Sequence, residues 1–544
     1  MLFASYNFLF LFLPIALAGY YLFAKLGADY AVGWLVLSSL AFYAAWNPAF
    51  VILLVCSIGF NFRVGRAMLA RVGDTEQAAK VRQRLLFLGV AANLLVLFSF
   101  KYLGPILSWG HSVSLVSSRL DFKVILPLGI SFFTFTQLGY LVDCKYGQGK
   151  DLDLIRYAAF VTLFPHLIAG PILHIREIGP QLLDPDTYTL SLKKLSIGTS
   201  FFVIGLAKKV LLADPLADVV KIGFAHPADF PMFATWLYAL AYSLQLYFDF
   251  SGYSDMAIGL AYMFGIRFPV NFDSPYRSRN IIDFWQRWHA TLTRYLTSFL
   301  YTPIALYTNR RRLRKRQGAS ARQARTFGSF CSIVLLPVLI TMGLAGIWHG
   351  AGLQFLLFGL MHGAYLAINH AWRWFGPKAG NNQGRIRKAC LAVSGVLLTY
   401  VAVVAADVMF RAASARAGFE MLGGMIGLHG IDPIPLPGTA MAMLRHLGGL
   451  HQFLTNTHHI LTVPSEDSAP APARLLLLFF IVWAVPNSQT IMANFSPTLT
   501  EVRPACPRWL QWQPTSRWGL AVGVLLALSL MSLQQTKVFL YFQF

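Results

Sequence analysis

Long apolar runs alternate with short polar stretches along the chain, and this pattern predicts membrane-spanning helices. A helix needs about 20 apolar residues to cross the hydrocarbon core of a bilayer. The runs that reach or approach this length cover residues 2–23, 31–60, 85–109, 122–143, 156–175, 195–213, 232–265, 328–347, 351–372, 389–410, 472–486 and 516–533. Some of these runs are too long for one span and others are too short. We therefore expect an all-α polytopic membrane protein with roughly 11–13 membrane helices.

The segment 268–308 departs from this pattern. Its apolar part, residues 297–308, is too short to cross a bilayer and is interrupted by Pro303. Irregular backbone at membrane depth is tolerated only where it is buried in protein or lines a watery cavity. We therefore expect interfacial or re-entrant helices in this segment, beside a functional site.

The composition narrows the class of protein. Of the 544 residues, 56% are apolar and 12% are charged, whereas an ordinary soluble domain carries about 25% charged residues. These values argue against a water-soluble multidomain enzyme and against a disordered chain. The five cysteines form no Cys-x-x-Cys pair, which argues against a disulfide framework or a zinc ribbon. No basic residue precedes Lys25, so we expect a retained first span and not a cleaved signal peptide.

The net charge of +22 bears on the orientation of the chain in the membrane and on its contact with anionic lipids. The stretches 309–325 and 373–388 are basic and contain no acid, and 63–84 is basic as well. Basic loops favour the cytoplasmic side, so we place all three there. Because no nucleic-acid motif is present, the charge predicts contact with anionic lipids and not with nucleic acid.

This topology fixes where other parts of the chain should lie. Two spans between residues 325 and 373 would meet near Gly346–Gly352, inside the membrane or on its far side. The segment 411–471, rich in Gly, Pro and His, is expected as an exported loop with short helices. Residues 487–517 would return to the cytoplasm, and the terminus 539–544 would face outward.

His349 is the foremost candidate for chemistry. It lies beside Trp348, between two glycines, where the two apolar spans meet. An ionisable residue at membrane depth is costly and is by default a functional hypothesis. Imidazole titrates near neutral pH and can act as a general base. The alternative is a histidine in a helix turn, held by a backbone carbonyl.

His289 is the second candidate. With Trp285 and Trp288 it has the spacing i, i+3, i+4, which would place the three side chains together on one helix face. An interfacial aromatic belt would have the same spacing. Basic residues of the same segment suggest the cytoplasmic interface, and they are Arg277, Arg279, Arg287 and Arg294.

Other polar residues in apolar surroundings invite a supporting role. Asp249 and Asp255 could orient a histidine, pair with an arginine or bind a cation, and we favour a structural or supporting role. His166 lies in Phe164–Pro171, where Pro and Gly should break a helix twice and either line a cavity or make a simple kink. We expect no metal site, since no His-Glu-x-x-His spacing occurs, and we find no nucleophile elbow or Walker loop.

Taken in chain order, a set of motifs resembles the membrane-bound O-acyltransferase (MBOAT) family. The resemblance is greatest to its branch of alginate O-acetylation membrane proteins and weaker to the D-alanyl transfer protein of teichoic acids. The motifs are FASYNFLFLFLP at 3–14, FYAAWNP at 42–48, FPHLIAGPI at 164–172, YFDFSGYSDMAIGLAYMFGI at 247–266, FWQRWHATLT at 284–293, GIWHGAG at 346–352, VMFRAAS at 408–414 and FLYFQF at 539–544. The resemblance therefore covers nearly the whole chain.

The resemblance implies a single membrane domain over 1–544, with a ring of helices around a thinned centre that holds a tunnel. It assigns the catalytic histidine to His349 and the donor-side histidine to His289. The family wording R-W-H-I-S-L reads Arg287-Trp288-His289-Ala290-Thr291-Leu292 here, a mild departure. Trp348, His166, Asp249 and Asp255 would support these groups.

The same resemblance implies the substrates. The donor would be acetyl-CoA, or another acyl thioester, on the cytoplasmic side of a bacterial inner membrane. Its phosphates would attract the four arginines of 268–308, beside Trp285 and Trp288. The acceptor would be an exported polysaccharide, reached directly or through a periplasmic acetyltransferase that works with a polysaccharide synthase. A covalent acyl-protein intermediate stays open.

Two other functions remain as alternatives. One is a transporter or channel for a polysaccharide or a lipid-linked sugar. The absence of an internal repeat and the few intramembrane carboxylates argue against it. The other is an acyltransferase that acts on a lipid or a protein, because no motif specifies the acceptor.

Overall fold

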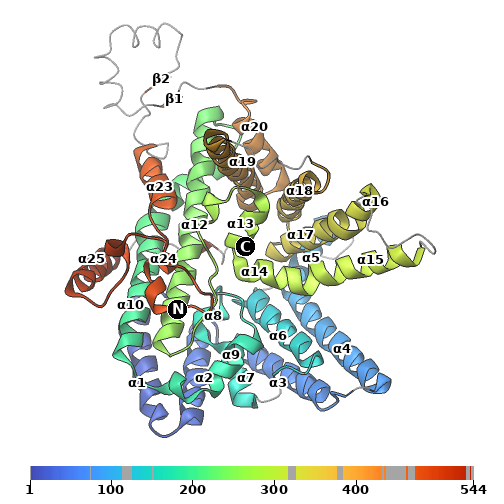
Figure 1. The fold of residues 1–544 in the computed structure, drawn as a ribbon, viewed down its shortest axis with the longest axis vertical. Coiled ribbons are helices and arrows are strands. Elements are labelled where there is room, and N and C mark those ends of the chain that lie inside the picture. The colour runs from blue at the N-terminus through green and yellow to red at the C-terminus, as the bar shows by residue number, and fades with distance from the viewer. Residues whose placement is uncertain are drawn as a thin grey trace. The chain divides into compact units, whose positions relative to one another are not determined.

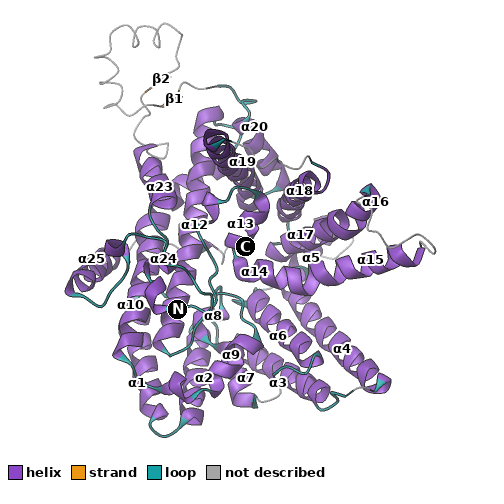
Figure 2. Cartoon of the chain, in the orientation of Figure 1, coloured by secondary structure: helices purple, strands orange, loops and turns teal. Residues whose placement is uncertain are grey.

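A computed structural model describes residues 2–73, 75–112, 125–149, 152–315, 326–376, 384–431, 434–435, 461–462, 472–533 and 539–540. Helices make up nearly all of the regular secondary structure in this described chain, as Figure 2 shows. Two short strands, β1 (Ile434–Pro435) and β2 (Leu461–Thr462), pair in parallel. The prediction of an all-helical protein is confirmed.

Five of the described helical stretches are long and apolar enough to cross a membrane: Ala49–Leu69, Glu76–Lys101, Leu192–Ala225, Phe327–His349 and Arg385–Arg411. Shorter apolar helices cover Phe8–Ala24, Ala28–Ala44, Pro472–Ala484 and Ser516–Ser532. The chain is therefore a polytopic membrane protein. The expected total of roughly 11–13 spans stays a prediction.

The chain divides into two compact units, and the long helix α12 (Met232–Met263) contributes residues to both. Unit 1 consists of Met1–Val210, Ser251–Asn271 and Pro486–Gln543, and unit 2 consists of Leu211–Phe250, Phe272–Val485 and Phe544. The other helices of unit 1 are α1 (Leu13–Ala24), α2 (Ala28–Ala44), α3 (Ala49–Leu69), α4 (Glu76–Lys101), α5 (Leu103–Ser112), α6 (Ile130–Lys145), α7 (Leu154–Thr162), α8 (Phe164–Leu167), α9 (Ile175–Leu183), α10 (Leu192–Ala207), α24 (Ser488–Ile491) and α25 (Ser516–Ser532). Those of unit 2 are α11 (Ala217–Ala225), α13 (Ile281–Arg287), α14 (Ala290–Leu296), α15 (Thr302–Lys315), α16 (Phe327–Phe330), α17 (Leu336–His349), α18 (Leu353–Phe375), α19 (Arg385–Arg411), α20 (Ala415–Met425) and α23 (Pro472–Ala484).

Amide side chains hold three helices of unit 1 together. The helix α6 packs against both α3 and α4 (Figure 1). Asn61 of α3 donates to Gln137 of α6 at 2.8 Å, and Asn93 of α4 donates to the Asn61 oxygen at 2.7 Å. Polar side chains that bond across helices stabilise a bundle in an apolar medium. This cluster is therefore a structural joint.

A helical hairpin formed by α17 and α18 dominates the packing of unit 2 (Figure 1). The two helices meet through Gly346 and Gly359, where a Cβ atom on either residue would collide with the backbone of the facing helix. The turn between them begins at Gly350, which is extended. Two helices meet near Gly346–Gly352, as predicted, and His349 lies at the end of α17. Of the two, α17 belongs to a stretch long and apolar enough to cross a membrane, and a crossing by α18 stays a prediction.

Three of the predicted apolar runs are each divided between two helices. The run 31–60 divides into α2 and α3 at Asn47–Pro48, because proline has no N–H to donate and disfavours a helical residue before it. The run 85–109 divides into α4 and α5 at Tyr102. Within the run 156–175, α7 ends at Thr162 and the chain turns at Leu163 into the short α8. Helical structure ends before Gly170. This double break was predicted and is confirmed.

The predicted interruption at Pro303 is wrong. The helix α14, a π-helical turn (Thr297–Tyr301) and α15 form one continuous helical stretch over 290–315. In the π turn the N–H of Thr302 bonds the carbonyl of Thr297. The wider turn just before Pro303 accommodates a residue that cannot donate a regular helical bond. Of the expected short α-helices of this segment, α13 stands alone, since α14 continues into α15.

Several predictions concern residues outside the described chain. These are the basic residues Arg316, Arg322, Arg325 and Lys378, most of the expected exported loop 411–471, and the terminal residues 541–544. The part of that loop within the described chain begins with α20. The side of the membrane on which each loop lies stays a prediction.

Candidate active site

Aromatic rings from three helices surround His349 at the end of α17. Its ring centroid lies 4.7 Å from that of Trp348, 5.1 Å from that of Phe410 in α19 and 5.8 Å from that of Phe358 in α18. The side chain is almost fully buried. The rings therefore hold a polar, titratable group in fixed apolar surroundings, which is the environment expected for a functional intramembrane histidine.

His289 occupies a strained backbone position. Its φ of 41° and ψ of 51° lie in the left-handed region, which side chains other than glycine seldom adopt. Strain of this kind costs of order 1–3 kcal/mol and clusters at functional sites. His289 caps the start of α14, and its ring lies 4.9 Å from that of Phe250 and 6.3 Å from that of Phe272.

The predicted helical spacing of Trp285, Trp288 and His289 is wrong. The helix α13 ends at Arg287, Trp288 is extended, and His289 adopts a left-handed backbone conformation at a bend before α14 begins. The three side chains therefore do not share one helix face. Trp288 instead packs between other rings, and its centroid lies 5.0 Å from that of Phe272 and 5.7 Å from that of Phe284.

Burial also sets the charge of His289, which lies in the short helices outside the long apolar spans. Desolvation lowers the pKa of its imidazole to about 3. The ring is therefore neutral near pH 7. A neutral imidazole can donate and accept one hydrogen bond each, so His289 can orient an uncharged part of a ligand.

A third buried histidine, His362 in α18, joins this site and was missed in the sequence. Its Nδ1 accepts a hydrogen bond from the indole N–H of Trp285 at 3.3 Å. Its signal was present, because His362 lies inside the apolar run 351–372 and meets the same criterion as His349. The sequence offered no way to see its partner.

A series of ring contacts connects the two predicted histidines within unit 2. Neighbouring ring centroids lie 4.8–6.3 Å apart along the order His289, Phe272, Trp288, Phe284, His362, Phe358 and His349. Two motifs that are 60 residues apart in the sequence, around His289 and His349, thus belong to one packed cluster. We call these seven residues the ring series.

The predicted arginines separate into two pairs. Arg277 donates to the carbonyls of Val482, at 2.9 Å, and Val485, at the end of α23. Arg287 pairs with Asp283 at 2.7 Å and lies 3.8 Å from Asp273. These contacts give both side chains partners within the protein. The other pair consists of Arg279, which is exposed, and Arg294, which is half-buried.

The supporting residues divide between the units. Asp255 belongs to unit 1, where it accepts from Lys208 at 2.6 Å, from Ser488 at 2.6 Å and from Gln489 at 3.2 Å. His166, also in unit 1, bonds the carbonyl of Phe160 through Nε2 at 2.9 Å. Both contacts are structural. Asp249 is buried and belongs to unit 2, as do His289 and His349.

A cavity of about 230 Å³ opens beside the ring series in unit 2. Trp285 and Gln286 of α13, Thr341 of α17 and His370 of α18 line it. The buried hydroxyl of Thr341 has no hydrogen-bond partner among the described residues. The cavity therefore has an apolar wall with a few polar groups, as small-molecule sites do.

The described residues contain no group of three or more His, Cys, Asp or Glu side chains that could hold a metal ion. The titratable side chains of the ring series are the imidazoles of His289, His349 and His362. A buried imidazole can move a proton or donate a hydrogen bond to a reacting oxygen.

Comparisons with known proteins agree on one family. The sequence model of the membrane-bound O-acyltransferase family matches residues 1–319. A peptidoglycan O-acetyltransferase of Helicobacter pylori is 34% identical over 475 residues, which are 82% of this chain and 84% of that protein. A probable alginate O-acetylase of Pseudomonas aeruginosa is 34% identical over the full length of both chains. One of Azotobacter vinelandii is 40% identical over 69% of each chain.

Proposed function

The chain belongs to the membrane-bound O-acyltransferase family, and we propose that it transfers an acetyl group from a cytoplasmic thioester across the membrane for O-acetylation of an exported polysaccharide. The observation that carries this proposal is the ring series, which joins His349 to His289 within one unit. Two relatives are named for the O-acetylation of peptidoglycan and of alginate, and these names support an exported polysaccharide as the acceptor.

His349 acts as the general base in this proposal. Its imidazole takes the proton of an acceptor hydroxyl, and the hydroxyl oxygen attacks the thioester carbonyl. The carbon–sulfur bond then breaks, and the leaving thiolate takes the proton back from the imidazolium. Proton and acyl group are thus both accounted for. An acyl-protein intermediate would divide the same transfer into two steps.

Acetyl-CoA is the proposed donor, and another acyl thioester would serve the same chemistry. Its phosphates would meet the arginines of this segment, of which Arg279 is exposed and Arg294 half-buried. The cavity beside Trp285 would take the uncharged thioester end, and the neutral ring of His289 would orient it.

The architecture implied by this function is a ring of helices around a thinned centre with a tunnel, set in a bacterial inner membrane. Periplasmic partners would be a soluble acetyltransferase that receives the acetyl group and a polysaccharide synthase that supplies the polymer. The acceptor could instead receive acetyl directly. Membership of an acyltransferase family favours an enzyme over the transporter alternative.

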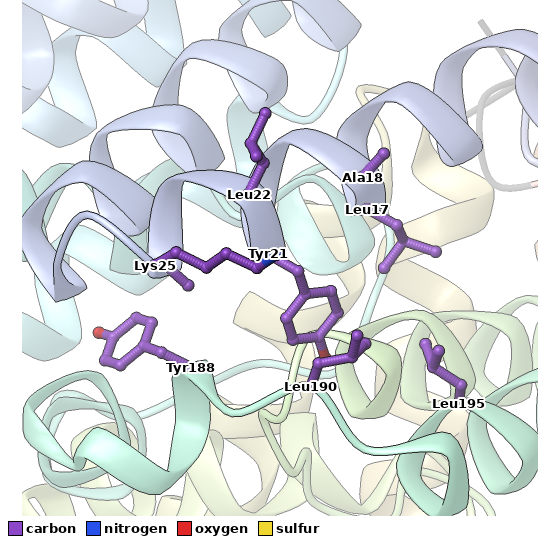
Figure 3. A pocket seen from close by; sticks show the side chains of 9 residues that line it. Leu17, Ala18, Tyr21, Leu22, Lys25, Tyr188, Leu190 and Leu195 are labelled. Carbon is purple, nitrogen blue, oxygen red and sulfur yellow. The ribbon is translucent and has the colours of Figure 1, made fainter.

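Anionic lipid is the further partner that we propose. A cavity of about 600 Å³ lies in unit 1 between α1 and the segment that leads into α10, as Figure 3 shows. Four leucines are among its nine lining residues, and Lys25 is the one charged residue among them. An acyl chain would follow the leucines while the phosphate of an anionic headgroup meets Lys25.

Purified protein in nanodiscs tests the enzymatic proposal. It should hydrolyse acetyl-CoA slowly, and it should transfer acetyl faster when polysaccharide and the partner acetyltransferase are supplied. Saturable sugar flux without any thioester turnover, with the partners present, would overturn the proposal in favour of a transporter. Acetyl transfer to lipid or protein, and not to polysaccharide, would replace the acceptor class.

A further inference from the structure

One hydrogen bond, from Trp285 to His362, links two parts of the site directly. Trp285 belongs to α13, which leads to the strained His289, and His362 belongs to α18, which forms the hairpin that carries His349. The indole N–H can only donate, so Nδ1 of His362 must accept and must carry no proton. The neutral His362 therefore holds its proton on Nε2.

Four aromatic rings fix the orientation of His362. Its centroid lies 4.8 Å from that of Phe358, 5.0 Å from that of Trp285, 5.8 Å from that of Tyr365 and 6.1 Å from that of Phe284, whose ring is parallel to it. The side chain is 1% exposed. A close-packed interior leaves such a ring one orientation, and the bond from Trp285 selects which edge faces α13.

His362 reaches His349 through one intermediate ring. Phe358 lies one helical turn before His362 in α18 and contacts His362 on one side and His349 on the other. Phe358 and His349 also share Phe410 as a neighbour, at 4.9 Å and 5.1 Å. A shift of His362 would therefore move the wall against which the His349 ring rests.

Trp285 connects the same arrangement to the cavity. One part of its side chain lines the cavity of about 230 Å³, while its N–H bonds His362. A group that enters the cavity would press on Trp285. The cavity, Trp285, His362, Phe358 and His349 thus form an unbroken line of contacts within unit 2.

We propose that His362 is a positioning residue: the hydrogen bond from Trp285 holds it, and through Phe358 it sets the orientation of the His349 ring. The pair also couples occupation of the cavity to that orientation. The inference rests on the proposed function only in taking His349 as the base. His362 does not touch the reacting atoms in this role.

Paired substitutions separate positioning from packing. His362→Phe keeps a ring but loses the acceptor, whereas His362→Asn loses the ring but keeps an acceptor near the place of Nδ1. Trp285→Phe removes the donor and keeps an aromatic wall. A hydrogen bond of this kind contributes about 0.5–1.5 kcal/mol, so we expect His362→Phe and Trp285→Phe each to lower kcat about two- to tenfold.

Two further features mark a positioning role. The double variant Trp285→Phe/His362→Phe should be no slower than either single variant, because both remove the same bond. KM for acetyl-CoA should change little in His362→Phe, and His362→Asn should recover part of kcat. Trp236→Phe is the matched control, since its indole N–H also bonds within unit 2 but its acceptor is the carbonyl of Met425 in α20. We expect wild-type kcat from it.

A second measurement does not depend on turnover. Diethyl pyrocarbonate modifies neutral imidazole, and peptide mass spectrometry gives the rate at His349 itself. That rate should change at least twofold in His362→Phe and Trp285→Phe and stay constant in Trp236→Phe. Additive losses in the double variant, or an unchanged modification rate in correctly folded variants, would overturn the positioning role. A wild-type protein without thioester turnover would contradict the proposed function and leave the modification test intact.

Discussion

Buried polar groups are handled differently in the two units. In unit 1, Asp255 accepts from Lys208, Ser488 and Gln489, and Asn61 bonds both Asn93 and Gln137. In unit 2, the three imidazoles of His289, His349 and His362 lie among aromatic rings. Polar side chains that bond one another across helices make joints between helices. Imidazole packed by rings keeps its proton chemistry while its position is fixed. The polar clusters of unit 1 therefore stabilise the fold, and the imidazoles of unit 2 are suited to proton transfer.

The largest expected effect is a loss of activity at His349 without a loss of stability. His349→Ala should lower polymer acetylation about 10²–10⁴-fold, because it removes a general base. Protein level and membrane insertion should stay near the wild-type values, since a histidine lining a site contributes little to packing. Polymer acetyl content is measured against protein level in the same cells. Wild-type acetylation from this variant would contradict the mechanism, and loss of the protein itself would favour a structural role.

Asp255→Ala should have the opposite profile. It leaves the part-buried Lys208 without its carboxylate, and breaking a fully buried ion pair costs about 3–5 kcal/mol, which is the upper bound here. We expect a lower melting temperature and less protein, with normal thioester turnover per folded molecule. Asp255→Asn keeps two of the hydrogen-bonding positions and should lose less. A stable but inactive Asp255→Ala protein would show that Asp255 takes part in the reaction and does not mainly hold helices together.

His289→Ala should have an intermediate effect. Losing a hydrogen bond to an uncharged group costs about 0.5–1.5 kcal/mol, which is roughly a two- to tenfold loss in kcat/KM. The loss should appear mainly in KM for acetyl-CoA, because His289 is proposed to position the donor. His289→Asn is the matched control for backbone strain, since asparagine tolerates the left-handed conformation better than alanine does. Normal KM in both variants would leave His289 as part of an aromatic belt.

The smallest effect is a dependence of stability on pH. Burial lowers the pKa of His289 to about 3, while an exposed histidine titrates near pH 6.5. Between these values the unfolded chain binds a proton that the folded chain does not. Stability should therefore rise with pH through this window, by up to about 1.4 kcal/mol per pH unit, and should level off above it. Melting curves of the wild type and of His289→Asn from pH 5 to pH 7.5 measure the difference. Equal slopes would show that His289 is not the group responsible.

Hydropathy and short motifs predicted much of this arrangement. Apolar runs located the long helices, and the glycines around His349 marked a tight meeting of two spans, which Gly346 and Gly359 explain by letting backbones touch. Pro48 could have divided the run 31–60, since Trp46-Asn47-Pro48 is a readable helix break. Local signals of this kind depend on backbone chemistry alone.

What the sequence could not supply was tertiary partnership. Helical periodicity placed Trp288 and His289 on one helix face. In the structure His289 has a left-handed backbone conformation, which interrupts the helix between α13 and α14. The bond from Trp285 to His362 joins residues 77 positions apart, and no local pattern encodes it. The partners of Asp255 come from distant segments for the same reason.

Sidedness is the central claim, because transfer across the membrane requires the donor on one face only. The direct measurement supplies membrane-impermeant acetyl-CoA to sealed vesicles of each orientation. Labelling of Arg314→Cys and Arg385→Cys reports which face is outside, and both positions should label together on the cytoplasmic face. Inside-out vesicles should consume external acetyl-CoA and acetylate acceptor enclosed in the lumen, whereas right-side-out vesicles should not. Equal consumption by both orientations, or labelling of the two positions from opposite faces, would contradict the account.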